Sequence, residues 1–206
     1  MKNLTLPIAD DEIRALEVGD PVSLSGLMIT GRDAVHKWMI DTFIKKRREP
    51  QGDDEAVYEA IKPILNGGAI YHCGPVVSGL DTGEYAFVAA GPTTSIREEP
   101  YQGDIMRHFN MKAVIGKGGM GEKTLAACSE VPGVYLHAIG GAASLIAQSV
   151  KEVRKVLKLE FGVPEAMWVI EVQDFPAVVT MDSHAGSLHA DVARRSTEIL
   201  SELLEE

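Results

Sequence analysis

Short apolar segments that lead into glycine-containing loops recur along this chain of 206 residues. Examples are residues 69–73, 85–90, 112–115 and 134–137. Strands that are buried on both faces have this continuous apolar character, because a packed layer covers each side of them. The pattern therefore predicts a buried sheet whose strands end in glycine-containing loops.

Helical segments separate these strands and set the fold class. Apolar residues with helical spacing follow Asp33, which we predict to be the helix N-cap. Further helices are predicted over 53–61, with Pro63 helping to end it, over 142–150 and from about 188, and further strands over 20–29, 168–172 and 177–181. Strands interleaved with helices indicate an α/β fold with a mixed, largely parallel sheet. No linker or repeat divides the chain, so we predict a single domain over residues 1–206.

The charge balance argues against some classes of partner. The chain has 20 Lys and Arg against 30 Asp and Glu, a net charge of −10, which is unsuited to non-specific binding of nucleic acid. No segment approaches the roughly 20 apolar residues of a membrane-spanning helix, and acidic residues at 10–12 are unlike a signal peptide. The two cysteines, Cys73 and Cys128, match no zinc or redox spacing. We therefore expect a cytoplasmic protein without a nucleic-acid or membrane partner.

Three cations lie in or beside the glycine-containing loops, namely Arg32, Arg97 and Lys117. Ligands of open α/β sheets bind beyond the carboxyl ends of the strands, and arginine holds a carboxylate through two parallel hydrogen bonds. This arrangement predicts a site for a small anion. Two alternatives stay open: Arg32 pairs with a local acid, and the hydroxyl run 93–95 caps the next helix.

The run Gly116-Lys117-Gly118-Gly119-Met120-Gly121 has the spacing of a dinucleotide-binding loop. The acidic residue expected about 20 positions later is missing, because 131–151 contains no Asp or Glu. A carboxylate or phosphate held by Lys117 and backbone N–H groups is the better interpretation. A nucleotide-binding protein remains an alternative.

The histidines form no metal motif. His72 and Cys73 are adjacent on a predicted strand, so their side chains point to opposite faces. We expect both to be packed in the core instead of forming a metal or nucleophile pair. His36 lies one helical turn beyond Arg32, where we predict a hydrogen-bonding role.

Taken together and in this order, the motifs resemble the β subunit of class I fumarases and L(+)-tartrate dehydratases. The same module is the C-terminal domain of single-chain class I fumarases. The resemblance covers about residues 2–185 and rests on Gly19 to Gly26, Thr30-Gly31-Arg32-Asp33-Ala34-Val35-His36, Tyr71-His72-Cys73-Gly74-Pro75-Val76, Ala90-Gly91-Pro92-Thr93-Thr94-Ser95, Gly116-Lys117-Gly118-Gly119-Met120, Gly140-Gly141-Ala142-Ala143 and Glu171-Val172-Gln173-Asp174-Phe175-Pro176.

The resemblance implies a swivelling β/β/α domain and a hydro-lyase that reversibly hydrates fumarate to L-malate. L(+)-tartrate dehydration is one alternative, and a non-catalytic module that binds a small anion is another. The resemblance also implies a [4Fe–4S] cluster ligated by three cysteines of a partner α subunit, not by this chain, and hence a hetero-oligomer. It places Arg32, Arg97 and Lys117 on the carboxylates of the substrate, with Thr93 as the base that removes the C3 proton. An aspartate of the α subunit is implied as the acid.

Overall fold

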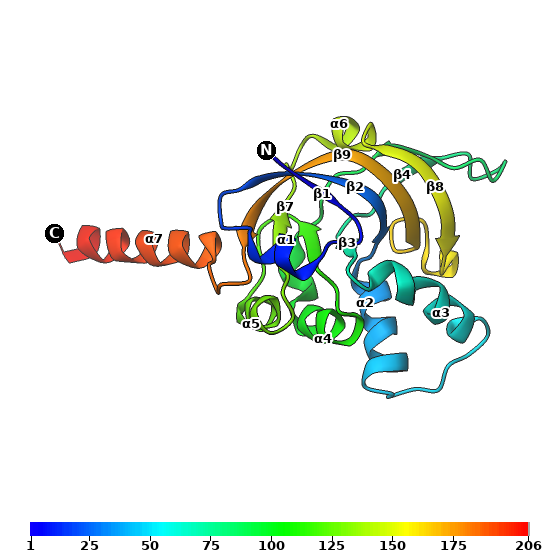
Figure 1. Ribbon diagram of the computed structural model, residues 1–206, viewed down its shortest axis with the longest axis horizontal. Coiled ribbons are helices and arrows are strands. Elements are labelled where there is room, and N and C mark those ends of the chain that lie inside the picture. The colour runs from blue at the N-terminus through cyan, green and yellow to red at the C-terminus, as the bar shows by residue number, and fades with distance from the viewer. Residues whose placement is uncertain (206) are drawn as a thin grey trace.

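A computed structural model describes residues 1–205 and shows a sheet of seven strands with helices packed on it (Figure 1). The strands of this sheet are β1 Lys2–Thr5, β2 Pro21–Thr30, β3 Ala69–Tyr71, β6 Ala113–Gly116, β7 Val134–His137, β8 Val150–Leu157 and β9 Met167–Met181. A separate hairpin consists of β4 Val76–Ser78 and β5 Ala86–Ala89. The α-helices are α1 Asp10–Arg14, α2 Asp33–Met39, α3 Asp54–Leu65, α4 Glu99–Phe109, α5 Glu122–Glu130, α6 Ala143–Ala147 and α7 Leu188–Glu205. Shorter elements are the π-helical turn η1 Ile40–Ile44 and the 3₁₀ turns η2 Ser95–Glu98 and η3 Leu159–Phe161.

The sheet closes into a ring because β9 pairs with β7 on one of its edges and with β2 on the other. The strand order is β1-β2-β3-β6-β7-β9-β8, and β9 also pairs with β2. Strands β1, β2, β3, β6 and β7 run parallel to one another, whereas β9 is antiparallel to β2, β7 and β8. The prediction of an α/β fold with a mixed, largely parallel sheet is confirmed. In Figure 1, β2 and β9 arch over the body, and α2 to α5 lie beneath them.

Side chains alternate between two apolar layers along the central strands. Tyr71 and Ile115 belong to one core cluster, and Ile70 and Val114 belong to the other. All four are fully buried, because successive residues of a strand point to opposite faces and both faces are covered. Each buried aliphatic side chain contributes roughly 1.5–3 kcal/mol of transfer free energy. The continuous apolar segments of the sequence are explained by this double burial.

Two helix ends differ from the prediction. Helix α3 continues through Pro63 to Leu65, because a proline in the last turn removes only one backbone hydrogen bond from a helix that is about to end. Helix α2 has Arg32 as its N-cap, and Asp33 is its first residue. The acidic side chain still lies at the positive end of the helix dipole, where it is favourable.

Three predicted strands and one predicted helix also need correction. The segment 85–90 is not a buried strand of the main sheet: β5 pairs with β4 in the separate hairpin, and its residues are exposed or half-buried. The segments 168–172 and 177–181 are parts of the single strand β9. The helix expected over 142–150 ends at Ala147, because Val150 already begins β8.

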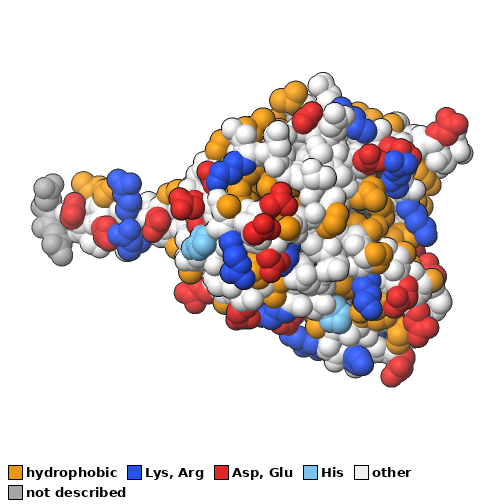
Figure 2. Space-filling model, viewed as in Figure 1, with side chains coloured by type: hydrophobic (Ala, Val, Ile, Leu, Met, Phe, Trp, Pro, Cys, Tyr) orange, Lys and Arg blue, Asp and Glu red, His pale blue; other side chains and the backbone are white. Residues whose placement is uncertain are grey.

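Helix α7 projects from the body at the end opposite the β4–β5 hairpin (Figure 1). Figure 2 shows hydrophobic atoms along one side of this helix. The apolar side chains that it exposes include Val192, Ile199, Leu200, Leu203 and Leu204. The helix predicted from about residue 188 is confirmed. Within residues 1–205, no helix has the length and apolar character to cross a membrane.

Candidate functional site

Two predicted site residues, Arg32 and Lys117, lie at the carboxyl ends of parallel strands, whereas Thr93 and Arg97 follow the hairpin strand β5. Arg32 follows β2 and Lys117 follows β6, while β3 pairs with both strands between them. The backbone N–H of Thr93 donates to the carbonyl of His72 at 2.7 Å, and its carbonyl accepts from the N–H of Lys117 at 3.1 Å. Arg97 forms an ion pair with the first residue of α2. These contacts bring the loops that carry the three cations and Thr93 into one region.

Both arginines have acidic partners in the structure. Arg32 Nη1 is 3.2 Å from Oε1 of Glu165, and Arg97 pairs with Asp33. The predicted alternative, local pairing of Arg32, therefore occurs. It does not prevent anion binding, because a guanidinium has five N–H donors. The side chains of Arg32 and Arg97 are 23% and 60% exposed, so each retains a solvent-facing part that a carboxylate can approach.

The hydroxyl of Thr93 has a defined partner. Thr93 Oγ1 donates to the carbonyl of His72 at 3.1 Å, so two hydrogen bonds from one residue converge on the same carbonyl. A threonine hydroxyl acts as a base only where neighbouring positive charge favours loss of its own proton. The backbone of Lys117 is hydrogen-bonded to Thr93, so one residue of the required charge is directly joined to it.

A buried chain of polar side chains, absent from the sequence predictions, lies behind these loops. His36 Nε2 and His72 Nε2 lie 3.0 and 2.9 Å from the amide oxygen of Gln102. His72 Nδ1 lies 2.9 Å from Ser95 Oγ, which accepts from the hydroxyl of Tyr135 at 2.8 Å. All five side chains are fully buried. The hydrogen-bonding role predicted for His36 and the packing predicted for His72 are both confirmed.

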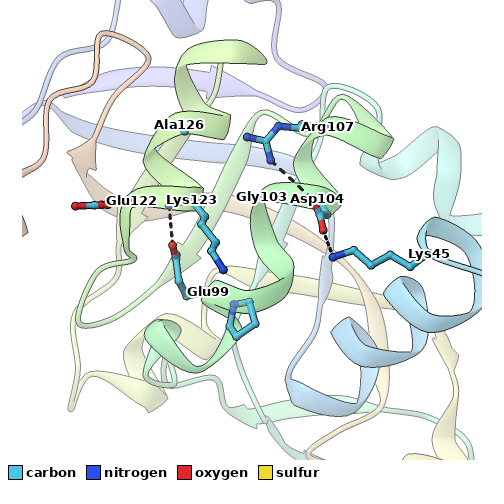
Figure 3. Close-up of a pocket in the computed structure, with 9 residues that line it drawn as sticks. Lys45, Glu99, Gly103, Asp104, Arg107, Glu122, Lys123 and Ala126 are labelled. Carbon is cyan, nitrogen blue, oxygen red and sulfur yellow. Dashed lines mark hydrogen bonds and ion pairs between the residues drawn. The ribbon is translucent and has the colours of Figure 1, made fainter. Parts of the chain in front are cut away.

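The glycine run after β6 does not offer a free helix end for a nucleotide. The carboxylate of Glu99 accepts from the backbone N–H groups of Gly121 and Lys123 at 2.8 and 2.9 Å and from the hydroxyl of Thr124 at 2.6 Å. Figure 3 shows this carboxylate directed at the start of α5. A pyrophosphate would need the same donors at the positive end of the helix. Because Glu99 already occupies these donors, the structure argues against the nucleotide-binding alternative.

A cavity of about 560 Å³ lies elsewhere, between the end of η1 and helices α4 and α5 (Figure 3). Acidic side chains pair with two of its three cations, since Lys45 lies 2.7 Å from Asp104 and Arg107 lies 2.5 Å from Glu130, and Glu99 and Glu122 also line it beside Lys123. A groove of mixed charge with internal ion pairs does not select a dianion. The candidate site therefore remains at the strand-end loops.

The two thiols of this chain do not fit the role of metal ligands. Cys73 and Cys128 are fully buried in different core clusters. Burial raises the pKa of each thiol to about 12, whereas a metal ligand must be a thiolate. Among the described residues, no group of three His, Cys, Asp or Glu side chains is arranged to hold a metal ion.

The profile of the family described as "Fumarase C-terminus" matches residues 2–192. The chain belongs to this family. The resemblance predicted from the loop motifs is confirmed, and the fumarase C-terminus match extends over β1 to the start of α7.

Two relatives illustrate the family. A protein of Geobacillus stearothermophilus that carries the name of a class I fumarate hydratase is 52% identical over 203 residues, which are 98% of this chain and 36% of that protein. The L(+)-tartrate dehydratase subunit beta of Escherichia coli strain K12 is 34% identical over 209 residues, covering 99% of this chain and 96% of that subunit. The chain thus spans about a third of the first relative and nearly all of the second. Both names denote hydro-lyases.

Glu98 makes the free energy of unfolding depend on pH in a way that can be tested. The side chain is 2% exposed, and its Oε2 has no hydrogen-bond partner. Burial, followed by the Asp33 carboxylate beside it, raises the pKa of Glu98 to about 8 from 4.5. The native state therefore retains a proton that the unfolded chain loses, so the free energy of unfolding decreases as the pH rises through this interval. The slope contributed is up to about 1.4 kcal/mol per pH unit.

We expect Glu98→Gln to flatten this pH dependence, because the amide keeps the shape of the protonated acid and does not titrate. Urea denaturation between about pH 5 and pH 8 measures the slope. Glu84→Gln, at an exposed position of the hairpin, is the control and should leave the slope unchanged. A variant Glu98→Gln with the slope of the wild type would contradict the assignment.

Proposed function

We propose that this chain is the β subunit of an iron–sulfur hydro-lyase that reversibly hydrates fumarate to L-malate, a reaction of the tricarboxylic acid cycle. The observation that carries the proposal is that the loops of Arg32, Thr93, Arg97 and Lys117 are joined by contacts in one region of a chain of net charge −10. Cations retained together on an acidic protein favour a dianionic ligand. We also propose that residues 1–206 act as one domain.

In this proposal the chain binds the substrate and moves one proton. Arg32, Arg97 and Lys117 hold the two carboxylates, and arginine does so through paired hydrogen bonds. In the dehydration direction Thr93 acts as its alkoxide, which the cations favour: Oγ1 takes the proton from C3 of malate and becomes the neutral hydroxyl. Removal of this proton builds negative charge on the adjacent carboxylate, and fixed cations stabilise that charge. In the hydration direction, Thr93 returns the proton to C3.

We propose that the [4Fe–4S] cluster and the acid that protonates the leaving hydroxyl belong to a partner α subunit, as in the enzymes that the sequence resembles. The buried, protonated thiols of Cys73 and Cys128 do not fit cluster ligation. The functional unit is then a hetero-oligomer. Free thiols suit a reducing compartment, and on that ground we propose the cytoplasm as its location.

L(+)-tartrate is the second candidate substrate. It is favoured by relatives that this chain matches over nearly their whole length and that are named as tartrate dehydratase β subunits. Tartrate is also a dicarboxylate with a hydroxyl beside a C–H bond, so the same cations and base suit it.

The decisive experiment is an assay of the pair. The chain is combined with its α subunit without oxygen, the cluster is assembled, and the rates with fumarate, L-malate and L(+)-tartrate are compared. Activity with fumarate that exceeds activity with tartrate supports the proposal. The reverse ratio supports the tartrate dehydratase. A loaded pair that is inactive with all three would overturn both.

We expect Arg97→Ala to raise the KM for the dicarboxylate about tenfold, with a smaller effect on kcat, because it removes a carboxylate ligand that acts before and during the reaction. Steady-state kinetics of the loaded pair measures both constants. Arg154→Ala is the matched control, because Arg154 is also exposed and ion-paired but lies on β8. An unchanged KM in Arg97→Ala would count against the assignment.

A further inference from the structure

We infer that Gln102 is a positioning residue for the proposed reaction: its amide group holds two buried histidine rings whose hydrogen bonds fix the loops of Thr93 and Arg32. This inference rests on the proposed function and adds a residue to it. Gln102 lies on α4, and the two rings come from α2 and from the end of β3. The rings of His36 and His72 meet edge to face, with centroids 5.0 Å apart.

The protons of this cluster allow one consistent arrangement. If the amide oxygen of Gln102 faces both rings, each Nε2 must carry a proton. His36 then needs a second proton, because its Nδ1 lies 2.9 Å from the carbonyl of Arg32 and must donate to it. The amide nitrogen of Gln102 is meanwhile left buried without a partner. Unpaired buried N–H groups are rarer and costlier than an underused carbonyl.

The opposite orientation of the amide satisfies every N–H donor of Gln102 and of the two rings. The two N–H bonds of the Gln102 amide then point at Nε2 of His36 and Nε2 of His72, and both rings stay neutral. Each ring carries its proton on Nδ1, where His36 donates to the Arg32 carbonyl and His72 donates to Ser95 Oγ. The oxygen of Ser95 has two lone pairs and also accepts from Tyr135.

The burial of the rings agrees with neutral imidazoles. Burial lowers the pKa of His36. Burial and the neighbouring His36 lower the pKa of His72 to about 3. A doubly protonated ring at this place is therefore disfavoured at neutral pH.

The cluster connects directly to the loops of the candidate site. The carbonyl of His72 accepts both the N–H and the hydroxyl of Thr93, so a fixed His72 fixes the proposed base. The backbone N–H of Ser95 donates to the carbonyl of Lys117 at 3.0 Å. The carbonyl of Arg32 accepts from the N–H and the ring of His36. One buried amide thus determines the orientation of backbone at three loops.

Gly116 shows how tightly the cluster is enclosed. A Cβ atom at this position would lie 1.9 Å from Ser95 Oγ, 3.2 Å from the Tyr135 hydroxyl and 3.3 Å from Cβ of His72. The first glycine of the run that resembles a nucleotide loop therefore makes room for the polar cluster. This packing leaves the Ser95 hydroxyl no alternative position on that side.

The first test reads the protons directly. The full-length chain is labelled with ¹⁵N in histidine, and the ring signals are assigned with the variants His36→Gln and His72→Gln. We expect both rings to be neutral, with the proton on Nδ1, from about pH 5 to pH 8. A proton on Nε2 of either ring, or a charged His36, would overturn the arrangement. This readout does not depend on enzyme activity.

The second test asks whether the arrangement positions the base. Gln102→Glu keeps the side-chain volume and, when ionised, has no N–H to donate, so it should move the His72 proton to Nε2. Gln102→Met keeps the length and removes the polar group. In the loaded pair we expect kcat to fall about tenfold or more in both variants. We expect KM to change by less than about threefold, because the cationic side chains are intact.

The control and the outcomes separate this inference from the proposed function. Gln51→Met, at an exposed loop position, should keep the wild-type kcat. Folded Gln102 variants with wild-type kcat would overturn the positioning role while the proposed function stands. A wild-type pair inactive with every dicarboxylate would overturn both the function and the positioning role, and the NMR result would still decide the hydrogen-bond arrangement. If neither Gln102 variant folds, the NMR result for the wild type decides the inference. Protons on Nε2 of His36 or His72 would then refute it.

Discussion

Replacing Thr93 by valine is expected to lower kcat of the loaded pair about a thousandfold, while the KM for the dicarboxylate stays within a few-fold. Valine keeps the branched shape of threonine and removes the oxygen that we propose as the base. Positioned general bases contribute roughly 10²- to 10⁴-fold, and the three cationic side chains remain in place. Steady-state kinetics with fumarate and with L-malate gives both constants.

Two measurements exclude a merely structural explanation of that loss. The iron content and the subunit ratio of the Thr93→Val pair should equal those of the wild type, because valine costs only the hydrogen bond to the His72 carbonyl. Thr5→Val, at an exposed position of β1, should be fully active. Full activity of Thr93→Val would show that another group removes the proton.

Replacing Lys158 by methionine is expected to lower the free energy of unfolding by about 3 kcal/mol. The Lys158 side chain is only 4% exposed, and its Nζ lies 2.7 Å from Asp54 and 2.5 Å from Asp53. Burial alone would lower the pKa of Lys158, but the neighbouring carboxylates outweigh this effect and raise it. Methionine leaves the buried carboxylate of Asp54 with less compensating charge. Urea denaturation at neutral pH measures the change.

A double variant tests whether the destabilisation by Lys158→Met comes from the carboxylate of Asp54 that remains buried. In the Lys158→Met background, Asp54→Asn should be less destabilising than it is in the wild type, because it removes the uncompensated charge. Lys155→Met is the matched control, since Lys155 is an exposed lysine of β8. We expect it to change the stability by less than about 0.5 kcal/mol. Additive effects of Lys158→Met and Asp54→Asn would contradict this account.

The elements predicted correctly from the sequence are those whose pattern lies within a few neighbouring residues. The strands β3, β6 and β7 are short, apolar and followed by turns, so their order and ends are readable from neighbouring residues. Arg32 and Lys117 could be placed at one edge because the parallel strands β2 and β6 end on the same side. The contacts that join Thr93 to His72 and Lys117 agree with that placement.

Strand β8 was missed because its pattern is not the pattern of a strand. Its register against β9 shifts between Val150 and Glu152 and again between Val153 and Lys155. Each irregularity interrupts the two-residue alternation, so the apolar residues recur at intervals close to those of a helix. A rule based on regular periodicity has no means of detecting such a strand.

The polar cluster was missed for a different reason. Gln102 is 66 residues from His36 and 30 from His72 along the chain. Nothing in the spacing of these residues indicates that they meet. Their contact depends on α4 packing against α2 and on the end of β3, which is a property of the assembled fold. Asp33 and Glu165, the acidic partners of the arginines, are separated in the same way.

The closing strand β9 has a consequence for how the protein is made. Its pairing with β2 joins Pro21 to Val178, so the ring of strands cannot close until β9 has been synthesised. Until then β2 has an open edge, which is prone to wrong pairing. The loops of Arg32, Thr93 and Lys117 leave the ribosome early, yet they gain a rigid frame only when β9 docks. Completion of the candidate site is therefore expected to coincide with the docking of β9, long after its loops have been synthesised.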